Sequence, residues 1–490
     1  MPEKIEKNYL DLLSSNVAAI DSLAATVRGT VGPKGFDVML IDQYGDYSST
    51  NDGVEILSKI EISHPAAKLA VEVAKAQEKK VGDGTTTATI VTDSLLKEAL
   101  LRVKSGISPN KLVKGINLAI NELCKTFEKE SKKIKDINDE KLLAITTISA
   151  RGDLELSSLL IDAIGRLSEI PEALDFSSLI KAEDAGKSRI LDGLFIKKKT
   201  HFNYNKDFKN APALFIEGAF EPKAIPAEAV TTDEGVKKFT TNLDLLEETA
   251  KKIVKAGIKA IFVDASMFSA IEEYFVKEGV FVLTRVKKED LKSLSLMSGT
   301  KMVNREDLFS ADLNKLKDFT GTLKSILFDD ELKGLIIEGS KFYLPTVLVS
   351  AETPLLLMEK ERIAIDAAKA MQKSLRSGYV LGEGLAEINA KDSLKQLDVS
   401  SDEKDGVEIV IKSLEALFRQ IVSNAGYDPE EMLSKVKGSK GIDFETGGII
   451  DLEEAGILDP LEVKTNAYKI AAEIACQILK INMIIQAKNV

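Results

Sequence analysis

The sequence predicts a multidomain α and α/β protein, in which an α/β domain is inserted into a mostly helical body. A chain of 490 residues is long enough for about three domains that each bury their own core. Apolar residues recur at helical spacing in the first and last thirds, whereas short apolar runs alternate with helical segments in the middle. An insertion between two helical parts explains this arrangement most simply.

The composition is that of an ordinary globular protein, with 44% apolar and 29% charged residues. A formal net charge of −11 argues against nucleic acid or an anionic membrane as a partner. The N-terminal region has no signal-peptide pattern, so we expect a cytoplasmic protein without a membrane span. Cys124 and Cys476 both fall in apolar helical patterns, and with two histidines they cannot form a disulfide framework or a zinc site.

The N-terminal third begins with a helix over residues 8–28, which ends at Gly29. The next residues, Thr30 to Pro33, form a turn that cannot continue a helix. A short strand over 37–42 and a hairpin-like segment to residue 50 follow. Asn51-Asp52-Gly53 then forms a turn with a carboxylate at its tip, and by itself this tripeptide indicates only a turn.

A glycine-rich loop, Gly82-Asp83-Gly84 followed by three threonines, lies between predicted helices over 65–80 and 85–103. The glycines allow backbone N–H groups to turn inward, and the threonines place hydroxyls at a helix N-terminus. This chemistry suits phosphate oxygens, and a carboxylate at Asp83 among phosphates implies Mg²⁺. A plain helix–loop–helix with a glycine turn and a threonine cap is the alternative that the loop alone leaves open.

Further predicted helices at 109–127 and 139–150 precede the middle of the chain, where strands and helices alternate. Strands are predicted over 213–217, 260–263, 280–283 and 335–338, and helices over 243–255, 267–277 and 288–296. Residues 219–242 are polar and interrupted by two prolines, so we expect an excursion from this domain that leads into the helix at 243.

The last third returns to helices, beginning with a well-patterned helix over 359–376 that carries Asp366 near its middle. After Gly378, a second glycine turn reads Gly382-Glu383-Gly384. Residues 447–463 are rich in turns, and a final amphipathic helix is predicted over 465–485.

Five segments that occur in order now indicate a family: GTVGPKGFDVML, STNDGVEIL, HPAAKLAVEVAKAQEKKVGDGTTTATIV, NAGYDP and AGILDPLEVKTNA. Together they resemble the group II chaperonins, the thermosome and eukaryotic cytosolic chaperonin lineage, and their shorter bacterial group III relatives. The similarity extends over nearly the whole chain. It implies an equatorial ATP-binding domain (1–129 and 377–490), an intermediate hinge domain (130–192 and 346–376) and an apical substrate-binding domain (193–345). The excursion at 219–242 and the helix after it would form the helical protrusion that serves as a built-in lid.

The resemblance also implies an ATP site. Asp83 would be the Mg²⁺ ligand, while Asp52 and Asp366 would orient and polarise the attacking water. Arg151 would sense the γ-phosphate from the hinge domain. The implied nucleotide-binding positions are Thr30, Val31, Gly32, Pro33, Asn51, Gly82, Gly84, Thr85, Thr86, Thr87, Arg151, Gly382, Glu383, Gly384, Asp443 and Asp459. Of these, Asp443 and Asp459 would lie near the base and the ribose.

The implied function is an ATP-dependent protein-folding chaperonin, a homo-oligomer or hetero-oligomer of two stacked rings that encloses non-native polypeptides. One departure concerns Glu383, because the family usually has a glycine there. A side chain pointing away from the nucleotide would be tolerated, whereas an inward carboxylate would weaken ATP binding. Glu383 is thus the sequence support for the alternative, a structural chaperonin-like subunit with impaired ATP turnover. A third reading, an unrelated kinase or phosphatase, does not explain the five ordered segments.

Overall fold

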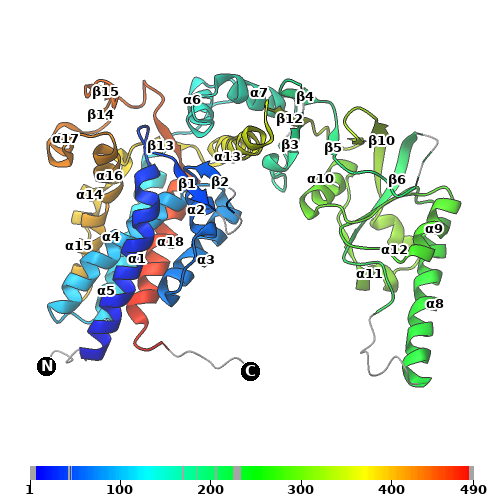
Figure 1. Cartoon of the computed structure of the whole chain (residues 1–490), viewed down its shortest axis with the longest axis horizontal. Helices are drawn as coiled ribbons and strands as arrows, with labels where there is room; N and C mark the ends of the chain where they lie inside the picture. Colours follow the sequence, from blue (N-terminus) through cyan, green and yellow to red (C-terminus); the bar gives the residue numbers. More distant parts are fainter. Residues whose placement is uncertain are drawn as a thin grey trace. The chain divides into compact units, whose positions relative to one another are not determined.

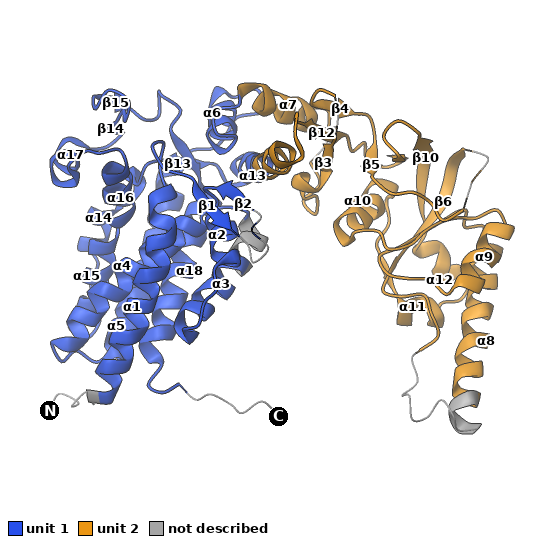
Figure 2. Ribbon diagram, viewed as in Figure 1, with its two compact units in different colours: residues 1–153, 366–490 blue, residues 154–365 orange. Residues whose placement is uncertain are grey.

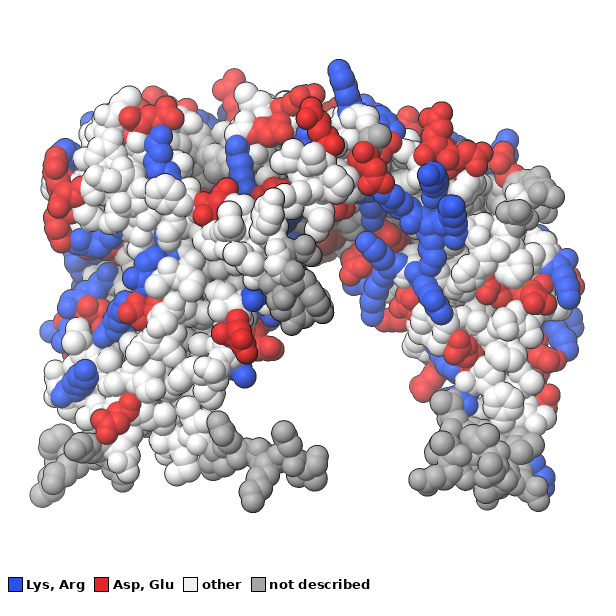
Figure 3. Space-filling model, in the orientation of Figure 1, with Lys and Arg blue, Asp and Glu red and all other residues white. Residues whose placement is uncertain are grey.

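The computed structural model describes residues 7–41, 45, 47–167, 170–184, 186–202, 204, 207–223 and 233–484. The chain forms two compact units, coloured separately in Figure 2. Unit 1 contains residues 1–153 and 366–490, and unit 2 contains residues 154–365. On the visible face of each unit, acidic and basic side chains are interspersed (Figure 3).

Unit 1 is built on long helices that pack side by side (Figure 1). They are α1 (Lys7–Val27), α4 (Thr85–Lys104), α5 (Pro109–Glu130), α15 (Lys404–Ser413) and α18 (Leu461–Lys480). Around them lie η1 (Arg28–Thr30), α2 (Gly53–Lys59), α3 (Pro65–Val81), α6 (Glu140–Ser149), α14 (Leu385–Lys395), α16 (Ala416–Asn424) and α17 (Pro429–Lys435). The apolar faces of α1 to α5, α14, α15 and α18 form one continuous core, in which the free cysteines Cys124 of α5 and Cys476 of α18 are buried. Helices α16 and α17 contribute to a second buried cluster.

Two contacts explain how this bundle packs. The segment Asn8–Thr30 is long and apolar enough to cross a membrane by composition alone. Its apolar residues have a packing role, however, because Leu13 and Ile20 are fully buried in the core where α1 packs against α4. Helices α5 and α15 approach closely at Gly115 and Gly406, where a Cβ atom on either residue would collide with the other helix.

Three two-stranded sheets of unit 1 shape the loops at the helix ends. The pairs are β1 (Val38–Ile41) with β2 (Tyr47–Thr50), β13 (Tyr379–Leu381) with β16 (Leu458–Pro460), and β14 (Lys440–Ile442) with β15 (Ile449–Asp451). In the second pair Val380 lies opposite Asp459, which brings the Gly382–Gly384 turn next to the segment before α18.

Unit 2 has a seven-stranded mixed sheet in the order β5-β11-β10-β6-β7-β8, with β9 also paired to β6. Its strands are β5 (Leu194–Ile196), β6 (Phe208–Glu217), β7 (Ala260–Val263), β8 (Phe281–Leu283), β9 (Val303–Asn304), β10 (Gly321–Asp329) and β11 (Gly334–Gly339). Its helices are α8 (Asp233–Lys255), α9 (Ser269–Lys277), α10 (Lys288–Ser298), α11 (Arg305–Ser310) and α12 (Leu313–Asp318). Residues Leu246 and Ile253 of α8 share one buried cluster with Leu214 and Ile261 of the sheet, so the C-terminal half of α8 is anchored in this core.

A smaller part of unit 2 contains a three-stranded sheet and the helix with which the unit begins in the sequence. The sheet order is β3-β12-β4, with α7 (Leu154–Gly165), η2 (Phe176–Leu179), β3 (Ile180–Glu183), β4 (Arg189–Leu191) and β12 (Thr346–Ser350). Helix α13 (Pro354–Ser377) then carries the chain from unit 2 into unit 1 between residues 365 and 366.

The predicted fold class is confirmed, but several predicted boundaries were wrong. Helix α8 begins at Asp233, ten residues before the predicted start, and α18 spans Leu461–Lys480 and not residues 465–485. Strand β6 begins at Phe208, and strand β10 was missed. Part of the predicted excursion, residues 224–232, lies outside the described residues. The seven-stranded sheet lies within the predicted apical range, and the three-domain division stays a prediction.

Candidate functional site

The glycine loop between α3 and α4 has the backbone that the sequence predicts. Gly82 and Gly84 adopt left-handed conformations with φ values of 83° and 88°, which glycine reaches without strain. Gly84 is the N-cap of α4, and no side chain among the described residues caps this helix end. The first N–H groups of α4 and the hydroxyls of Thr85 to Thr87 are therefore grouped at the positive end of a 20-residue helix. This arrangement suits an anion such as a phosphate group.

Asp83 in this loop is surrounded by charged groups. The residue is exposed at the surface, although many protein atoms surround its carboxylate. Its Oδ1 accepts a 2.5 Å hydrogen bond from the Gly84 N–H. Loss of hydration raises the pKa of Asp83, Asp459 and Asp52 raise it further, and Lys369 acts in the opposite direction. Crowding of carboxylates is relieved when a cation binds among them.

The residues around Asp83 fit a magnesium ion that is also bound to phosphate groups. Among the described residues, no group of three His, Cys, Asp or Glu side chains is placed to hold a metal. A magnesium ion bound to phosphates needs only one or two carboxylates from the protein, because phosphate and water oxygens supply the rest. Asp83 can fill that role.

The Asn51-Asp52-Gly53 turn lies directly against the glycine loop. Asp52 is the N-cap of α2 and accepts a 2.9 Å hydrogen bond from the Val54 N–H. A Cβ atom on Gly53 would collide with Oγ1 of Thr86, so only glycine permits this approach. The structure thus brings Asp52 next to the predicted phosphate loop, although the two are about thirty residues apart in the sequence.

The turn from Thr30 to Pro33 is held in place by α1 and α16. Thr30 is buried, and its Oγ1 donates a 2.9 Å hydrogen bond to the Val27 carbonyl. Asn424 of α16 donates a 2.8 Å hydrogen bond to the Val31 carbonyl. Gly32 has a φ of 89° and lies against Ile421, so this turn has one fixed conformation.

Helix α13 brings Asp366 towards the same loop. The side chain of Lys369 lies across Gly82, where a Cβ atom would collide with Lys369 Cδ. Asp366 precedes Lys369 by three residues and therefore lies on the same side of the helix. Lys369 was missed in the sequence reasoning, because its place beside Asp83 arises only from the packing of α13.

The Gly382-Glu383-Gly384 turn settles which way Glu383 points. Glu383 has a left-handed backbone with φ of 56°, and its Oε2 is buried with no hydrogen-bond partner among the residues that the structure describes. Burial, then Asp459 and Asp443, raises the pKa of Glu383 to about 8. The side chain therefore points inward, towards the two carboxylates predicted to lie near the base and ribose.

A buried ion pair supports Asp459. Lys464 of α18 lies 2.6 Å from Asp459 and 2.9 Å from Glu387, and it is only 4% exposed. Burial alone would lower the pKa of Lys464, but Asp459 and Glu387 outweigh it and the pKa is raised. Lys464 and Glu387 were missed, yet one signal was present, because Lys464 lies on the same stripe of its helix as Leu461 and Tyr468.

Asp443 and Arg151 occupy turns. Asp443 accepts hydrogen bonds from Thr446 Oγ1 (2.7 Å) and the Glu445 N–H (2.9 Å), which hold its pKa below the usual range. Arg151 has a left-handed backbone with φ of 55° directly after α6 and is exposed. It is not among the groups that shift the pKa of Asp83, so its predicted role stays a prediction.

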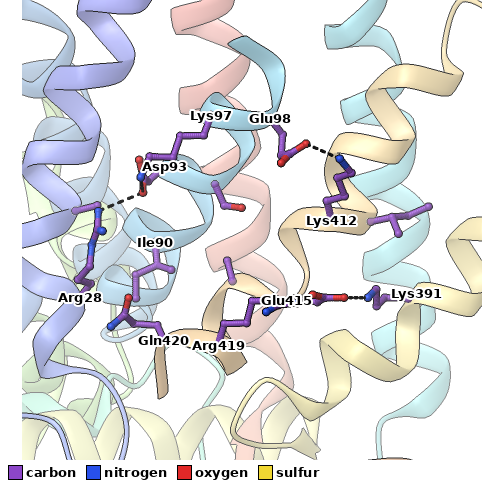
Figure 4. Close-up of a pocket in the computed structure, with 14 residues that line it drawn as sticks. Arg28, Ile90, Asp93, Lys97, Glu98, Lys391, Lys412, Glu415, Arg419 and Gln420 are labelled. Atoms are coloured by element: carbon purple, nitrogen blue, oxygen red, sulfur yellow. Dashed lines mark hydrogen bonds and ion pairs between the residues drawn. The ribbon is translucent and has the colours of Figure 1, made fainter. Parts of the chain in front are cut away.

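A separate hollow of about 490 Å³ lies between α1, α4, α14, α15 and α16 (Figure 4). The figure shows Arg28 bonded to Asp93, Lys412 to Glu98 and Lys391 to Glu415 across it. None of the predicted nucleotide-binding residues lines this hollow. Since its charges are paired with one another, it is an ion-pair network between helices.

Comparison with known proteins decides the family. Residues 23–489 match the model of the TCP-1/cpn60 chaperonin family. The chain belongs to this family. It is 33% identical to a thermosome subunit of Pyrococcus horikoshii (98% of this chain, 92% of the relative) and 30% identical to thermosome subunit alpha of Thermoplasma acidophilum (97% and 91%). A crystal structure of a group III chaperonin in the open state matches with a TM-score of 0.71 and 31% identity, covering 98% of this chain and 100% of that one.

The predicted family and activity are therefore confirmed. The chain is an ATP-dependent chaperonin subunit, and its enzymatic activity is ATP hydrolysis. As in the rest of the family, it binds nucleotide and protein substrates and works in a ring-shaped oligomer.

Proposed function

We propose that this chaperonin binds ATP with Mg²⁺ around Asp83 and uses its hydrolysis to enclose non-native polypeptides in a chamber of two stacked rings. The observation that carries the proposal is the surroundings of Asp83. Two left-handed glycines and the uncapped end of α4 flank this carboxylate, while Asp52, Asp459 and Lys369 act on its pKa. Few arrangements other than a metal-bound polyphosphate make use of all these groups.

Each predicted residue then has a role in the site. The loop from Gly82 to Thr87 and the turn from Thr30 to Pro33 hold phosphate oxygens, and Asn51 approaches them. Asp83 holds Mg²⁺, which neutralises charge on the phosphates. Asp52 and Asp366 orient the attacking water and accept its proton. Arg151 senses the γ-phosphate, and the remaining positions bind the nucleoside: Gly382, Glu383, Gly384, Asp443 and Asp459.

The lid would come from unit 2. Helix α8 extends beyond the other elements of that unit (Figure 1), and its residues 237–241 are exposed. Phe239 is 44% exposed there, although α8 is firmly packed from Leu246 onwards. A helix that leaves its domain in this way supports a role for residues 219–242 as the built-in lid of a cytoplasmic chamber that needs no separate co-chaperonin cap.

The test separates chemistry from binding. Asp366→Ala is expected to keep nucleotide affinity and lose about 10²-fold or more in turnover, because the water loses its proton acceptor. Asp83→Ala is expected to lose the Mg²⁺ dependence of nucleotide binding itself. Steady-state ATP hydrolysis and equilibrium binding are measured on assembled rings, with Asp392→Ala as control, since that side chain is 81% exposed on α14. Unchanged turnover in Asp366→Ala would refute its catalytic role.

The retention of Asp52, Asp83 and Asp366 argues against a purely structural subunit, since such a subunit has no need of all three. If wild-type rings assemble but neither bind nor hydrolyse ATP, the structural alternative would be correct.

A further inference from the structure

The feature that carries the inference is the conformation of Glu383. A residue with a Cβ atom at φ of 56° is strained by about 1 kcal/mol relative to glycine. The backbone on both sides is fixed, because a Cβ atom on Gly382 would lie 3.0 Å from the Ile457 carbonyl oxygen and one on Gly384 would lie 2.9 Å from the Phe418 nitrogen. Glu383 therefore cannot relax by moving the turn, and its side-chain direction is set by the fold.

The surroundings of this carboxyl group contain more negative than positive charge. Asp459 on β16 and Asp443 after β14 both act on it, and its own Oε2 is buried and has no hydrogen-bond partner in the described part of the chain. Lys464 on α18 is already bonded to Asp459 and Glu387. Lys34 is paired with Glu445 at 3.7 Å and acts on Asp443. Neither lysine thus compensates a charge on Glu383, and the neutral acid is the favoured form.

We propose that Glu383 contacts the nucleoside part of the bound nucleotide as a neutral carboxylic acid, and that its ionisation lowers nucleotide affinity. The proposal rests on the proposed function, since it requires the nucleotide to bind beside Asp443 and Asp459. Glu383 would then determine nucleotide affinity at a position where the family usually has glycine.

The chemistry of the neutral acid supports this role. A protonated carboxyl group offers one O–H donor and one carbonyl acceptor, so it can exchange hydrogen bonds with hydroxyl, ring-nitrogen or amine groups of a nucleoside. Such a contact would satisfy the buried Oε2 atom, which no described residue of the chain satisfies. A carboxylate at the same place would add a third negative charge beside two carboxylates and near the phosphates. The two protonation states should therefore differ in affinity.

The sign of the pH effect follows directly. Burial and the two aspartates raise the pKa of Glu383 to about 8. A nucleotide that binds only the neutral form raises the pKa further, so binding takes up a proton near this pH. Affinity is then full below the pKa and falls as the pH rises through it. We expect a loss of about tenfold between pH 7 and pH 9.

The experiment measures the dissociation constant of ADP with Mg²⁺ at both pH values, on assembled rings of the wild type, Glu383→Gln and Glu383→Gly. Glutamine has the shape and hydrogen-bonding groups of the neutral acid but cannot ionise, so Glu383→Gln is the matched control. We expect it to bind as the wild type does at pH 7 and to lose less than about twofold at pH 9. Glu383→Gly relieves the backbone strain and removes the contact. It should therefore bind ADP more weakly than the wild type at pH 7, and its affinity should lose the pH dependence that Glu383 causes.

The results that would overturn the proposal are distinct. Equal pH dependence in the wild type and Glu383→Gln would show that other groups titrate and would refute an effect of Glu383 ionisation on affinity. Equal affinity of Glu383→Gly and the wild type at pH 7 would refute the contact. Failure of all three proteins to bind ADP at either pH, with rings intact, would overturn the nucleotide site itself and this proposal with it. Proton uptake on binding, measured by calorimetry in two buffers of different ionisation enthalpy, should be present in the wild type near pH 8 and absent in Glu383→Gln.

Discussion

Removal of the buried Lys464, which pairs with Glu387 and Asp459, should destabilise unit 1 strongly. In Lys464→Met, Glu387 would lose the ion pair that compensates its charge, although it is fully buried (0% exposed). Breaking one partner of a buried pair typically costs about 3–5 kcal/mol, because the other charge stays uncompensated. Asp459 is affected less, since its side chain is 37% exposed and can be hydrated. The magnitude therefore comes mainly from Glu387.

Hydrogen exchange of the α18 amides measures this cost without complete unfolding of a two-unit chain. We expect exchange to be at least about a hundredfold faster in Lys464→Met than in the wild type. The control is Lys412→Met, whose pair with Glu98 spans 3.1 Å at the surface with the lysine 56% exposed. Such a pair contributes at most about 1 kcal/mol, so α18 should exchange nearly as in the wild type.

Equal exchange in Lys464→Met and Lys412→Met would refute the reasoning. The double variant Lys464→Met with Glu387→Met should recover most of the lost protection, because two apolar side chains then replace the buried charges. It should nevertheless bind nucleotide more weakly than the wild type, since Asp459 has lost the lysine that positions it. Stability and positioning are thereby separated.

Two further predictions concern the glycine loop and the lid. Gly84→Ala should weaken nucleotide binding about tenfold in calorimetry. Alanine is strained at a φ of 88°, and its Cβ atom would lie 3.2 Å from Val463 Cγ1, so the N-terminus of α4 would be displaced. The control is Gly106→Ala, which has a similar φ of 92° but no described atom within 4 Å of the added Cβ, so affinity should not change. Deletion of residues 222–241 should leave ATP hydrolysis intact and abolish enclosure of substrate, and persistent protection of an enclosed polypeptide from protease would contradict the lid role.

The sequence was sufficient for features that depend on neighbouring residues. The glycine loop and the helices on either side of it could be predicted because glycine conformation and helical periodicity are local properties. The start of α8 could not be predicted, because residues 237–241 are exposed and have no apolar stripe that would indicate a helix there. The predicted end of α18 was wrong for the opposite reason, because the apolar residues after Lys480 extend the helical pattern without being buried in the core.

At the site, the limits of prediction follow from distance along the chain. The pair of Lys464 with Glu387 joins residues 77 positions apart, and the approach of Lys369 to Gly82 depends on where α13 packs. The direction of the Glu383 side chain was left open, because it depends on the φ angle of one residue and on charges from two other turns. The sequence gives the residue type at each position, but it does not show which distant residues contact one another in the folded chain.

The two cysteines give the protein an internal reporter. Cys124 and Cys476 are buried on neighbouring helices of unit 1, and burial raises the pKa of the Cys476 thiol to about 11. A thiol of this kind reacts with a soluble reagent only when the helices around it separate. Since the sequence holds no other cysteine, any thiol modification of the native protein records the opening of unit 1 alone. The rate of that reaction therefore measures how often unit 1 opens locally, while unit 2 carries no cysteine and contributes nothing to the signal.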